Sequence, residues 1–333
     1  MAGPEVRASG RPPGWGASGG PGVSERLAGP RALRPWVAVK IRFAVAPQAG
    51  PVSRSALLEF ADAIEAAGFD GIWLSDLPVG PVVDPLLGLA LVAGRTRRLR
   101  LGANVVPLGR NPFLLAKELA QLDQLSDGRL LLSFVTGLNQ PGERAALGLD
   151  GAGRGAILEE VLSLARAWWA GESVSHRSSR WSFDGLAPAA RPVQEPLEVW
   201  LGGRGPKALD RVGRVADGWL GAQLAPDETG PAREDIQAAA RRAGREIDPE
   251  HFGLSIPYAR AAPTPAMLAA VAARRADADP SALLPQGADG LRAFIDGCVA
   301  RGLSKFVVRP AGPVASWADE AAWLADAILD LQT

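Results

Sequence analysis

Apolar positions along the chain follow two patterns with different periods. Short runs of β-branched and aromatic residues, of which residues 39–46 are the first, are typical of strands. The segments between these runs carry apolar residues three and four positions apart, as at Leu57, Ala61 and Ile64, and this spacing predicts helices with one buried face. From residue 39 onward, strand and helix are therefore predicted to alternate.

Eight such strands can be recognised, and each is followed by at least one helix. The strands are predicted over residues 39–46, 69–75, 99–105, 130–135, 197–201, from 218 onward, 252–258 and 305–309. The helices are predicted over residues 53–67, 85–92, 112–125, 157–170, 206–215, 233–243, 266–275, 289–301 and 317–331. Glycine-containing turns such as Gly68 and Asp217-Gly218 mark the change from helix to strand.

This order of elements predicts an α/β fold, a closed (β/α)8 TIM barrel formed by one domain over residues 38–333. A proline-rich stretch around Pro280 and Pro285 predicts a short insertion before the last strand. Function in such barrels lies at the carboxyl ends of the strands. The residues that follow each strand are therefore the candidates for a site.

Residues 197–221 contain the most informative of these strand ends. Their sequence, LEVWLGGRGPKALDRVGRVADGWLG, predicts a strand, a glycine turn, a helix and a second strand. Pro206 suits the first helical position, because it has no N–H to leave unpaired and its φ is already helical. The open N–H groups at a helix start, with Arg204 and Lys207 beside them, favour the binding of a phosphate.

The same turn allows two other interpretations. Any α/β protein needs glycine at some turns from strand to helix, and the two cations could simply be solvated. Gly203, Gly205 and Ala208 also satisfy G-x-G-x-x-A, which is typical of dinucleotide-binding folds. Two observations disfavour that interpretation: the motif lies in mid-chain, and no acidic residue ends a following strand at the distance of a ribose contact.

Composition argues against several classes of function. With 36 basic and 36 acidic residues the net charge is zero, so the chain as a whole has no electrostatic attraction to nucleic acid or an anionic membrane. No apolar run is long enough to cross a membrane. The single cysteine, Cys298, excludes an internal disulfide and suits a reducing cytoplasm. With only His176 and His251 in addition, we expect no structural metal site.

Residues 1–37 differ from the rest of the chain. They are rich in Gly, Pro, Arg and Ser and show no apolar periodicity. We expect a disordered extension or an upstream-extended start, because this composition cannot bury enough surface to become ordered. We do not expect a secretory signal, since no apolar core of signal-peptide length follows the arginines.

From about Lys40 onward the chain resembles the luciferase-like flavin and deazaflavin oxidoreductase superfamily, in particular its branch that uses the deazaflavin coenzyme F420. Four segments carry the resemblance, in this order: GFDGIWLSDL, RLRLGANVVPLGRNPFLLAKELAQLDQLSDGRLLLSFVTGLN, ILEEVLSLARAWWAGESVS with the later WSFDG, and RPVQEPLEVWLGGRGPKALDRVGRVADGWLGA. The fold that the resemblance implies is the same barrel. The implied cofactor is F420, with flavin mononucleotide (FMN) as the alternative.

The resemblance implies that the tricyclic ring of the cofactor lies across the mouth of the barrel, with its phosphate on the glycine turn. Asp76 would contact the deazaflavin, or else cap a loop at a strand end. Asn104-Val105 falls where family members carry a bulge with a non-prolyl cis peptide behind the ring. The implied cofactor-binding residues are Asp76, Asn104, Val105, Thr136, Gly137, Asn139, Gly202, Gly203, Arg204, Gly205, Pro206 and Lys207.

Two departures from the family pattern affect the chemistry. The deazaflavin-dependent sugar-phosphate dehydrogenases have a histidine and a glutamate where this chain has Leu77 and Leu138. Leucine cannot transfer a proton, so we do not expect oxidation of a sugar alcohol by that pair, and the catalytic residue is unknown. The cofactor would still carry hydride transfer. The candidates for the substrate pocket are Gln48, Leu77, Leu138, Tyr258 and Arg309.

We therefore expect a reductase that uses reduced F420 and acts on a small apolar molecule, such as an activated alkene or a hydrophobic ketone. One alternative is an FMN-dependent luciferase-like monooxygenase. A non-catalytic deazaflavin- or flavin-binding protein is a second, because Leu77 and Leu138 replace ionisable residues. A nicotinamide dehydrogenase is the least favoured alternative and would require an open sheet. Members of the family often pair through outer helices, so the resemblance is compatible with a homodimer.

Overall fold

The computed structural model describes residues 39–333 with the exception of residues 51, 139, 150–152 and 189. The predicted extension over residues 1–37 and the candidate cofactor contact Asn139 lie outside the described residues.

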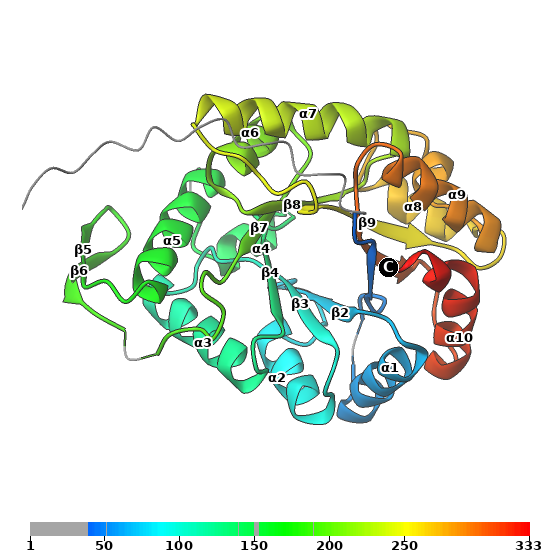
Figure 1. Cartoon of the computed structure of the whole chain (residues 1–333), viewed down its shortest axis with the longest axis horizontal. Helices are drawn as coiled ribbons and strands as arrows, with labels where there is room; N and C mark the ends of the chain where they lie inside the picture. Colours follow the sequence, from blue (N-terminus) through cyan, green and yellow to red (C-terminus); the bar gives the residue numbers. More distant parts are fainter. Residues whose placement is uncertain (1–38, 51, 139, 150–152, 189) are drawn as a thin grey trace, which may run out of the picture. The chain divides into compact units, whose positions relative to one another are not determined.

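Eight parallel strands form a closed barrel in the order β1-β10-β9-β8-β7-β4-β3-β2, as the sequence predicted (Figure 1). The interpretation of G-x-G-x-x-A as a dinucleotide motif of an open sheet is therefore wrong. The barrel strands are β1 (Arg42–Val45), β2 (Gly71–Ser75), β3 (Arg100–Val105), β4 (Leu130–Phe134), β7 (Val199–Gly202), β8 (Gly218–Ala222), β9 (Phe252–Tyr258) and β10 (Lys305–Pro310).

Helices surround the barrel, and the sequence predicted all of the α-helices except the short helix Pro141–Ala146, because most of their starts carry recognisable signals. The side chains of Ser53, Asp84 and Asn111 cap the helices that follow them. The helices are α1 (Arg54–Ala67), α2 (Pro85–Arg95), α3 (Pro112–Leu125), α4 (Pro141–Ala146), α5 (Arg154–Trp169), α6 (Pro206–Val215), α7 (Pro226–Arg242), α8 (Pro265–Ala272), α9 (Gly287–Val299) and α10 (Trp317–Ile328), with short 3-10 helices η1 (Pro280–Leu283) and η2 (Leu329–Leu331). No helix within the described part of the chain is both long and apolar enough to cross a membrane.

Helix α7 begins earlier than the sequence pattern suggested, at Pro226 instead of near residue 233. Its true start has two recognisable signals: a proline at the first helical position, and Asp227 and Glu228 in the first turn. The Glu228 carboxylate accepts a hydrogen bond from the Ala225 backbone N–H at 2.8 Å, which closes the start of the helix. Pro231 inside the helix obscured this segment in the sequence.

A hairpin of strands β5 (Val174–Arg177) and β6 (Ser182–Leu186) was not predicted. It follows α5 and lies beside that helix, outside the barrel (Figure 1). The indole Nε1 of Trp168 on α5 donates to the Leu186 carbonyl at 2.9 Å, and its ring packs edge-on against Phe183. This packing anchors the hairpin, although its own residues show little apolar alternation.

The inside of the barrel and the layer between barrel and helices are packed separately. The two faces alternate along each strand. On β2, for example, Ile72 and Leu74 pack toward the helices, whereas Trp73 lies inside the barrel with Leu220 and Val307. Trp73 and Trp200 were both predicted to be core residues on strands, and both contribute to this inner layer, Trp200 as a partly buried member.

Candidate functional site

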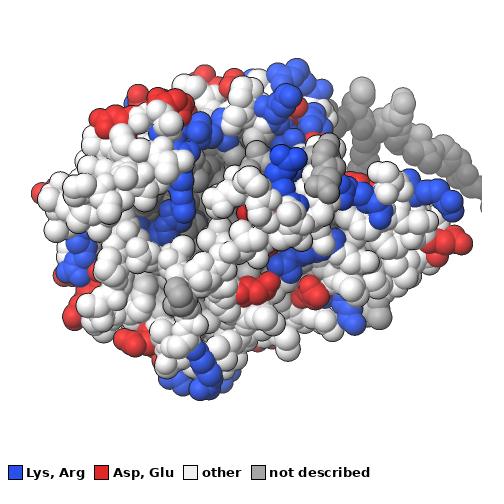
Figure 2. Space-filling view, turned by 180° about the vertical axis from the view of Figure 1, so that it is seen from behind, with Lys and Arg blue, Asp and Glu red and all other residues white. Residues whose placement is uncertain are grey.

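A cavity of about 580 Å3 opens at the carboxyl ends of the barrel strands, and we call it the mouth cavity. The face shown in Figure 2 is hollowed, and Lys and Arg side chains lie in and beside the hollow. The volume of the mouth cavity lies within the range of about 300–1,000 Å3 that is usual for small-molecule sites. The predicted site residues that line the cavity are Gln48, Asp76, Leu77, Asn104, Gly137, Leu138, Gly202, Gly203 and Arg309.

The glycine turn lies on the mouth side of the barrel, as a phosphate site requires. Gly202 ends β7, and Gly203 follows with a φ of +115°, which favours glycine. The Trp219 indole holds the turn in place by donating to the Gly203 carbonyl at 2.8 Å. Gly205 is the N-cap of α6, and no described side chain caps this helix start. A Cβ atom on Gly205 would meet nothing within 4 Å, so the turn borders open space.

The two cations of the turn differ in their surroundings. The Arg204 guanidinium lies 3.8 Å from the Asp277 carboxylate, so part of its charge is already balanced within the chain. Lys207 is exposed near the start of α6 and has no ion-pair partner among the described side chains. The glycine turn reaches the mouth cavity through Gly202 and Gly203. The described lining of the cavity does not include five other predicted cofactor contacts: Thr136, Arg204, Gly205, Pro206 and Lys207.

Asp76 is a buried carboxylate at the end of β2 that connects two neighbouring strand ends. Its Oδ2 accepts a hydrogen bond from the Val106 N–H at 3.1 Å and from the Arg110 guanidinium at 2.9 Å. Arg110 also binds Asp84, the N-cap of α2, at 2.8 Å. Burial raises the pKa of Asp76, and the charge of Arg110 opposes that rise. Sequence analysis missed Arg110, whose only signal was its position just after the third barrel strand.

Asn104 faces the mouth cavity, but the structural expectations for Asn104-Val105 are wrong. The Asn104 side-chain amide donates to Ser75 Oγ at 3.0 Å. Asn104 and Val105 both continue the regular parallel pairing of β3 with β4, so no bulge is present at these two residues. Among the described residues the one cis peptide bond joins Glu195 to Pro196. Val105 is fully buried between barrel and helices, because alternate side chains of a strand point to opposite faces.

Alternation also explains why Tyr258 does not line the cavity. Tyr258 follows Ile256 on the helix-facing side of β9, where its hydroxyl donates to the Glu320 carboxylate at 2.6 Å and its ring stacks on Trp323. On the inward side of the same strand, Ser255 reaches the cavity instead. The expectation of a pocket contact from Tyr258 is therefore wrong. Arg309 on β10 has the inward register and does line the cavity.

Two buried polar atoms at the mouth cavity have no hydrogen-bond partner among the described residues. They are Gln223 Oε1, at the end of β8, and Trp73 Nε1, inside the barrel. The backbone of Gln223 has a φ of +60°, a conformation that is uncommon for residues other than glycine and is often found at functional sites. An acceptor and a donor left open in a cavity fit a polar ring that is bound there.

Arg309 and Arg274 bring positive charge into the mouth cavity. Neither has an ion-pair or hydrogen-bond partner in the part of the chain that the structure describes, and Asp76 is the one acidic residue of the described lining. Burial, and to a lesser extent the charge of Arg274, lower the pKa of Arg309 to about 10. Arg274 was not recognised from the sequence, because it falls at the end of the helix predicted over residues 266–275 and does not follow a strand.

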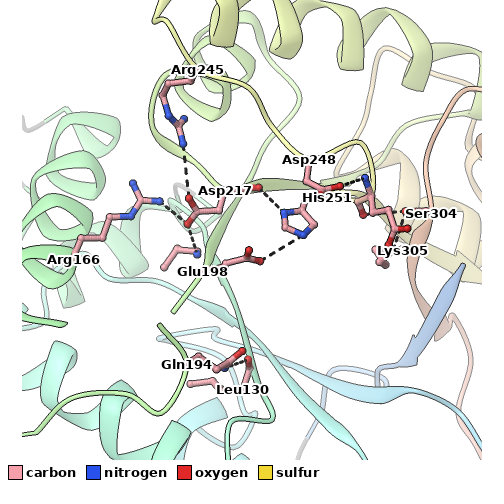
Figure 3. A network of polar contacts seen from close by, with 12 residues as sticks. Leu130, Arg166, Gln194, Glu198, Asp217, Arg245, Asp248, His251, Ser304 and Lys305 are labelled. Atoms are coloured by element: carbon pink, nitrogen blue, oxygen red, sulfur yellow. Dashed lines mark hydrogen bonds and ion pairs between the residues drawn. The ribbon is translucent and has the colours of Figure 1, made fainter. Parts of the chain in front are cut away.

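The opposite end of the barrel carries a network of charged residues at the starts of the strands (Figure 3). His251 Nδ1 lies 3.0 Å from the Asp217 carbonyl, and its Nε2 lies 3.6 Å from Glu198. The Asp217 carboxylate accepts hydrogen bonds from Arg166 and from the Val199 N–H. Burial raises the pKa of Glu198, which the charge of His251 opposes. The expectation that His251 lies on the stabilising end of the barrel is confirmed.

A second cavity, of about 400 Å3, lies at that end and is lined by charged residues such as Glu198, Glu250 and Lys305. Trp73 and Leu220 line both cavities and so form the layer between them. The other histidine, His176, is on the hairpin, where its Nε2 lies 2.7 Å from Glu160. Neither histidine reaches the mouth cavity.

Residues 36–301 match the family model described as luciferase-like monooxygenase. This chain belongs to that family. Its luciferase-like barrel is shared by a monooxygenase, RslO1 from Streptomyces bottropensis, which is 22% identical and superposes with a TM-score of 0.74 over 88% of this chain and 100% of that one.

Two sequence relatives of this luciferase-like protein are named as a reductase and as a dehydrogenase. The 5,10-methylenetetrahydromethanopterin reductase of Methanolobus tindarius is 30% identical over 57% of this chain and 57% of its own. The F420-dependent glucose-6-phosphate dehydrogenase of Amycolatopsis mediterranei is 30% identical over 62% of this chain and 65% of its own. The chain thus spans less than two thirds of the length of either relative.

Proposed function

We propose that this luciferase-like protein is an oxidoreductase that transfers hydride from reduced deazaflavin, coenzyme F420, to a small organic substrate in the mouth cavity. The observation that carries the proposal is one cavity that joins the glycine turn of β7 to the polar strand ends of β2 and β3. The F420-dependent dehydrogenase among the relatives supports the choice of cofactor.

The residues at the mouth fit a cofactor with a polar ring and a phosphate. The turn from Gly202 to Lys207 would hold the phosphate through backbone N–H groups and the partial positive charge of the α6 N-terminus. Gln223 Oε1 and Trp73 Nε1 would meet polar atoms of the ring, because each is buried without a partner among the described residues. When bound, the cofactor supplies the hydride, and the protein orients it and excludes water.

The substrate would lie on an apolar wall built by the loops after β1 and β2. Val52, Leu77, Val82 and Val83 belong to this wall, and Leu138 lines the same cavity from the loop after β4. None of these side chains carries a proton that it could transfer. The wall therefore positions a substrate for hydride transfer without ionising it, which suits reduction of an activated alkene or a ketone.

The test is to identify the cofactor that copurifies with the protein by absorbance and mass, and then to titrate the protein with F420 and with FMN. We expect tight binding of F420 and oxidation of reduced F420 by a panel of enones and ketones. An absence of binding of both cofactors would overturn the proposal.

Two alternatives remain, each with its own readout. The family model and the RslO1 structure favour an FMN-dependent monooxygenase, which consumes oxygen with reduced FMN. Leu77 and Leu138 motivate the alternative of a non-catalytic cofactor-binding protein, which would bind F420 tightly and turn over none of the panel.

The location proposed for the protein is the cytoplasm, in keeping with its buried, unpaired Cys298. A homodimer is expected from the resemblance alone, and light scattering tests it.

A further inference from the structure

The mouth cavity contains a positive charge that the described chain does not balance. Arg309 projects from the inward-facing register of β10, and Arg274 reaches the same cavity from the segment after α8. Among the described residues, no carboxylate lies within 4 Å of the guanidinium group of Arg309 or of Arg274. Asp76, the acidic residue of the lining, is already bound by Arg110.

A guanidinium withdrawn from water without a counter-ion is costly to a folded protein. Several other half-buried or buried arginines of this chain do have carboxylate partners: Arg275 binds Glu228 and Asp277, and Arg211 binds Glu159. Arg309 has no carboxylate partner among the described residues, and burial together with the nearby charge of Arg274 lowers its pKa to about 10. The side chain still carries its charge at neutral pH. An anion from outside the described chain would balance it.

The site proposed for the phosphate of the cofactor is a different one, the glycine turn elsewhere on the barrel rim. In the strand order β10-β9-β8-β7, two strands separate Arg309 from the glycine turn. The turn also has its own cations, Arg204 and Lys207. The mouth therefore offers two separate positions for negative charge, one on β7 and one on β10.

The surroundings of Arg309 indicate what kind of molecule carries the second anion. Strand β1 lies between β10 and β2, so the apolar wall of Val52, Val82 and Val83 begins one strand away from the arginine. Gln48, on the loop after β1, donates its amide to the Ala311 carbonyl at 3.2 Å and thereby joins the β1 and β10 loops. An elongated molecule can contact both the wall and the guanidinium.

We propose that Arg309, with Arg274 at the rim, binds the anionic end of the substrate, and that the substrate is an organic acid whose apolar body packs on the wall of Val52, Val82 and Val83. This inference rests on the proposed function for the identity of the reaction, but the binding site itself does not require it. It also refines the sequence-based expectation of a purely apolar substrate.

The first experiment measures binding without any cofactor. A series of ω-phenylalkanoates from 4 to about 10 carbons is compared with the matching ω-phenylalkanols by calorimetry. We expect the best acid to bind at least about tenfold tighter than its alcohol, because a hydrogen bond to a buried charge is stronger than a neutral one. In Arg309→Gln this preference should disappear. In the control Arg292→Gln, which removes an exposed partner of Asp330, it should persist.

Three outcomes would overturn the inference. Acids that bind no tighter than the alcohols, including no detectable binding of either series, exclude an anion site. An acid preference that survives in Arg309→Gln assigns it to another residue. A loss of F420 affinity in Arg309→Gln, with the acid preference unchanged, assigns the arginine to the cofactor. If the protein binds neither F420 nor FMN, the proposed function fails, yet the comparison of acids with alcohols still decides the anion site.

Discussion

Gly102 on β3 provides the space that the indole ring of Trp73 on β2 occupies inside the barrel. A Cβ atom on residue 102 would overlap Cε3 of that ring, far inside van der Waals contact. The two residues are partners in the parallel register of β2 and β3. Because Trp73 lies between the two cavities, this fit sets the depth of the mouth cavity.

Gly102→Ala should therefore destabilise the protein by about 1–3 kcal/mol or more, because overpacking a closed core forces side chains out of their rotamers. Urea denaturation measures the change in the free energy of unfolding. Gly94→Ala is the matched control: its Cβ would meet nothing within 4 Å, and alanine favours the α2 helix, so stability should stay equal or rise slightly. Equal stability of the two variants would contradict the packing of Trp73.

The phosphate site can be separated from the stability of α6 by two substitutions at Gly205. Its φ of −78° accommodates any residue, and Asn and Asp are both good N-caps, so both variants should fold as well as the wild type. Gly205→Asp places a carboxylate where a phosphate would bind, and we expect its affinity for F420 to fall at least about tenfold below that of Gly205→Asn.

Fluorescence titration with F420, together with thermal denaturation, gives both quantities for Gly205→Asp and Gly205→Asn. Equal affinities in the two variants would place the phosphate away from this turn. A lower melting temperature of the aspartate variant alone would instead indicate a fold defect, and the asparagine variant serves as its reference.

The network around Asp217 should matter for stability and leave the mouth cavity unaffected. Its carboxylate accepts hydrogen bonds from Arg166 and from the Val199 N–H and lies 3.8 Å from Arg245. Asp217→Asn should cost about 1–3 kcal/mol of unfolding free energy, because it leaves two half-buried arginines without this partner.

Asp62→Asn, which breaks the exposed pair with Arg95, should cost less than about 0.5 kcal/mol. Denaturant unfolding of both variants and F420 titration of Asp217→Asn test the prediction. A loss of cofactor affinity without loss of stability would show that the two ends of the barrel are coupled.

Cys298 should be unreactive as long as the protein is folded. It is fully buried in α9, and burial raises its pKa to about 12, an effect that the charge of Arg301 opposes. Because the thiolate is the reacting species, a raised folded pKa keeps the thiol protonated up to strongly alkaline pH, whereas the unfolded thiol ionises near pH 8.5. An aromatic disulfide reagent at pH 8 should react with the unfolded chain within minutes and with the native protein only through unfolding. Rapid modification of native protein would contradict this burial.

Sequence patterning predicted most elements because their signals are local. Capping residues such as Ser53 and Asn111, followed by apolar periodicity, define helix starts without reference to the rest of the chain. The hairpin of β5 and β6 was missed for the converse reason. It is held by the contact of Trp168 with Phe183, a pair fifteen positions apart whose packing no sequence window reveals.

Site residues were predicted less evenly, because position after a strand does not say which way a side chain points. Asn104 and Arg309 have the inward register and line the mouth cavity, whereas Val105 and Tyr258 face the helices. One residue of shift along a strand moves a side chain from one face to the other, and the ends of predicted strands are uncertain by more than that.

By itself, the sequence determined the closed barrel, its family and the place of the glycine turn, since periodicity, capping and turn chemistry are encoded in neighbouring residues. The tertiary structure alone decided that Arg309 and Arg274 meet in one cavity without a described counter-ion, and that Gln223 and Trp73 present open polar atoms there. These properties depend on contacts between distant strands, and whether a charge is balanced is known only when all its neighbours in space are known.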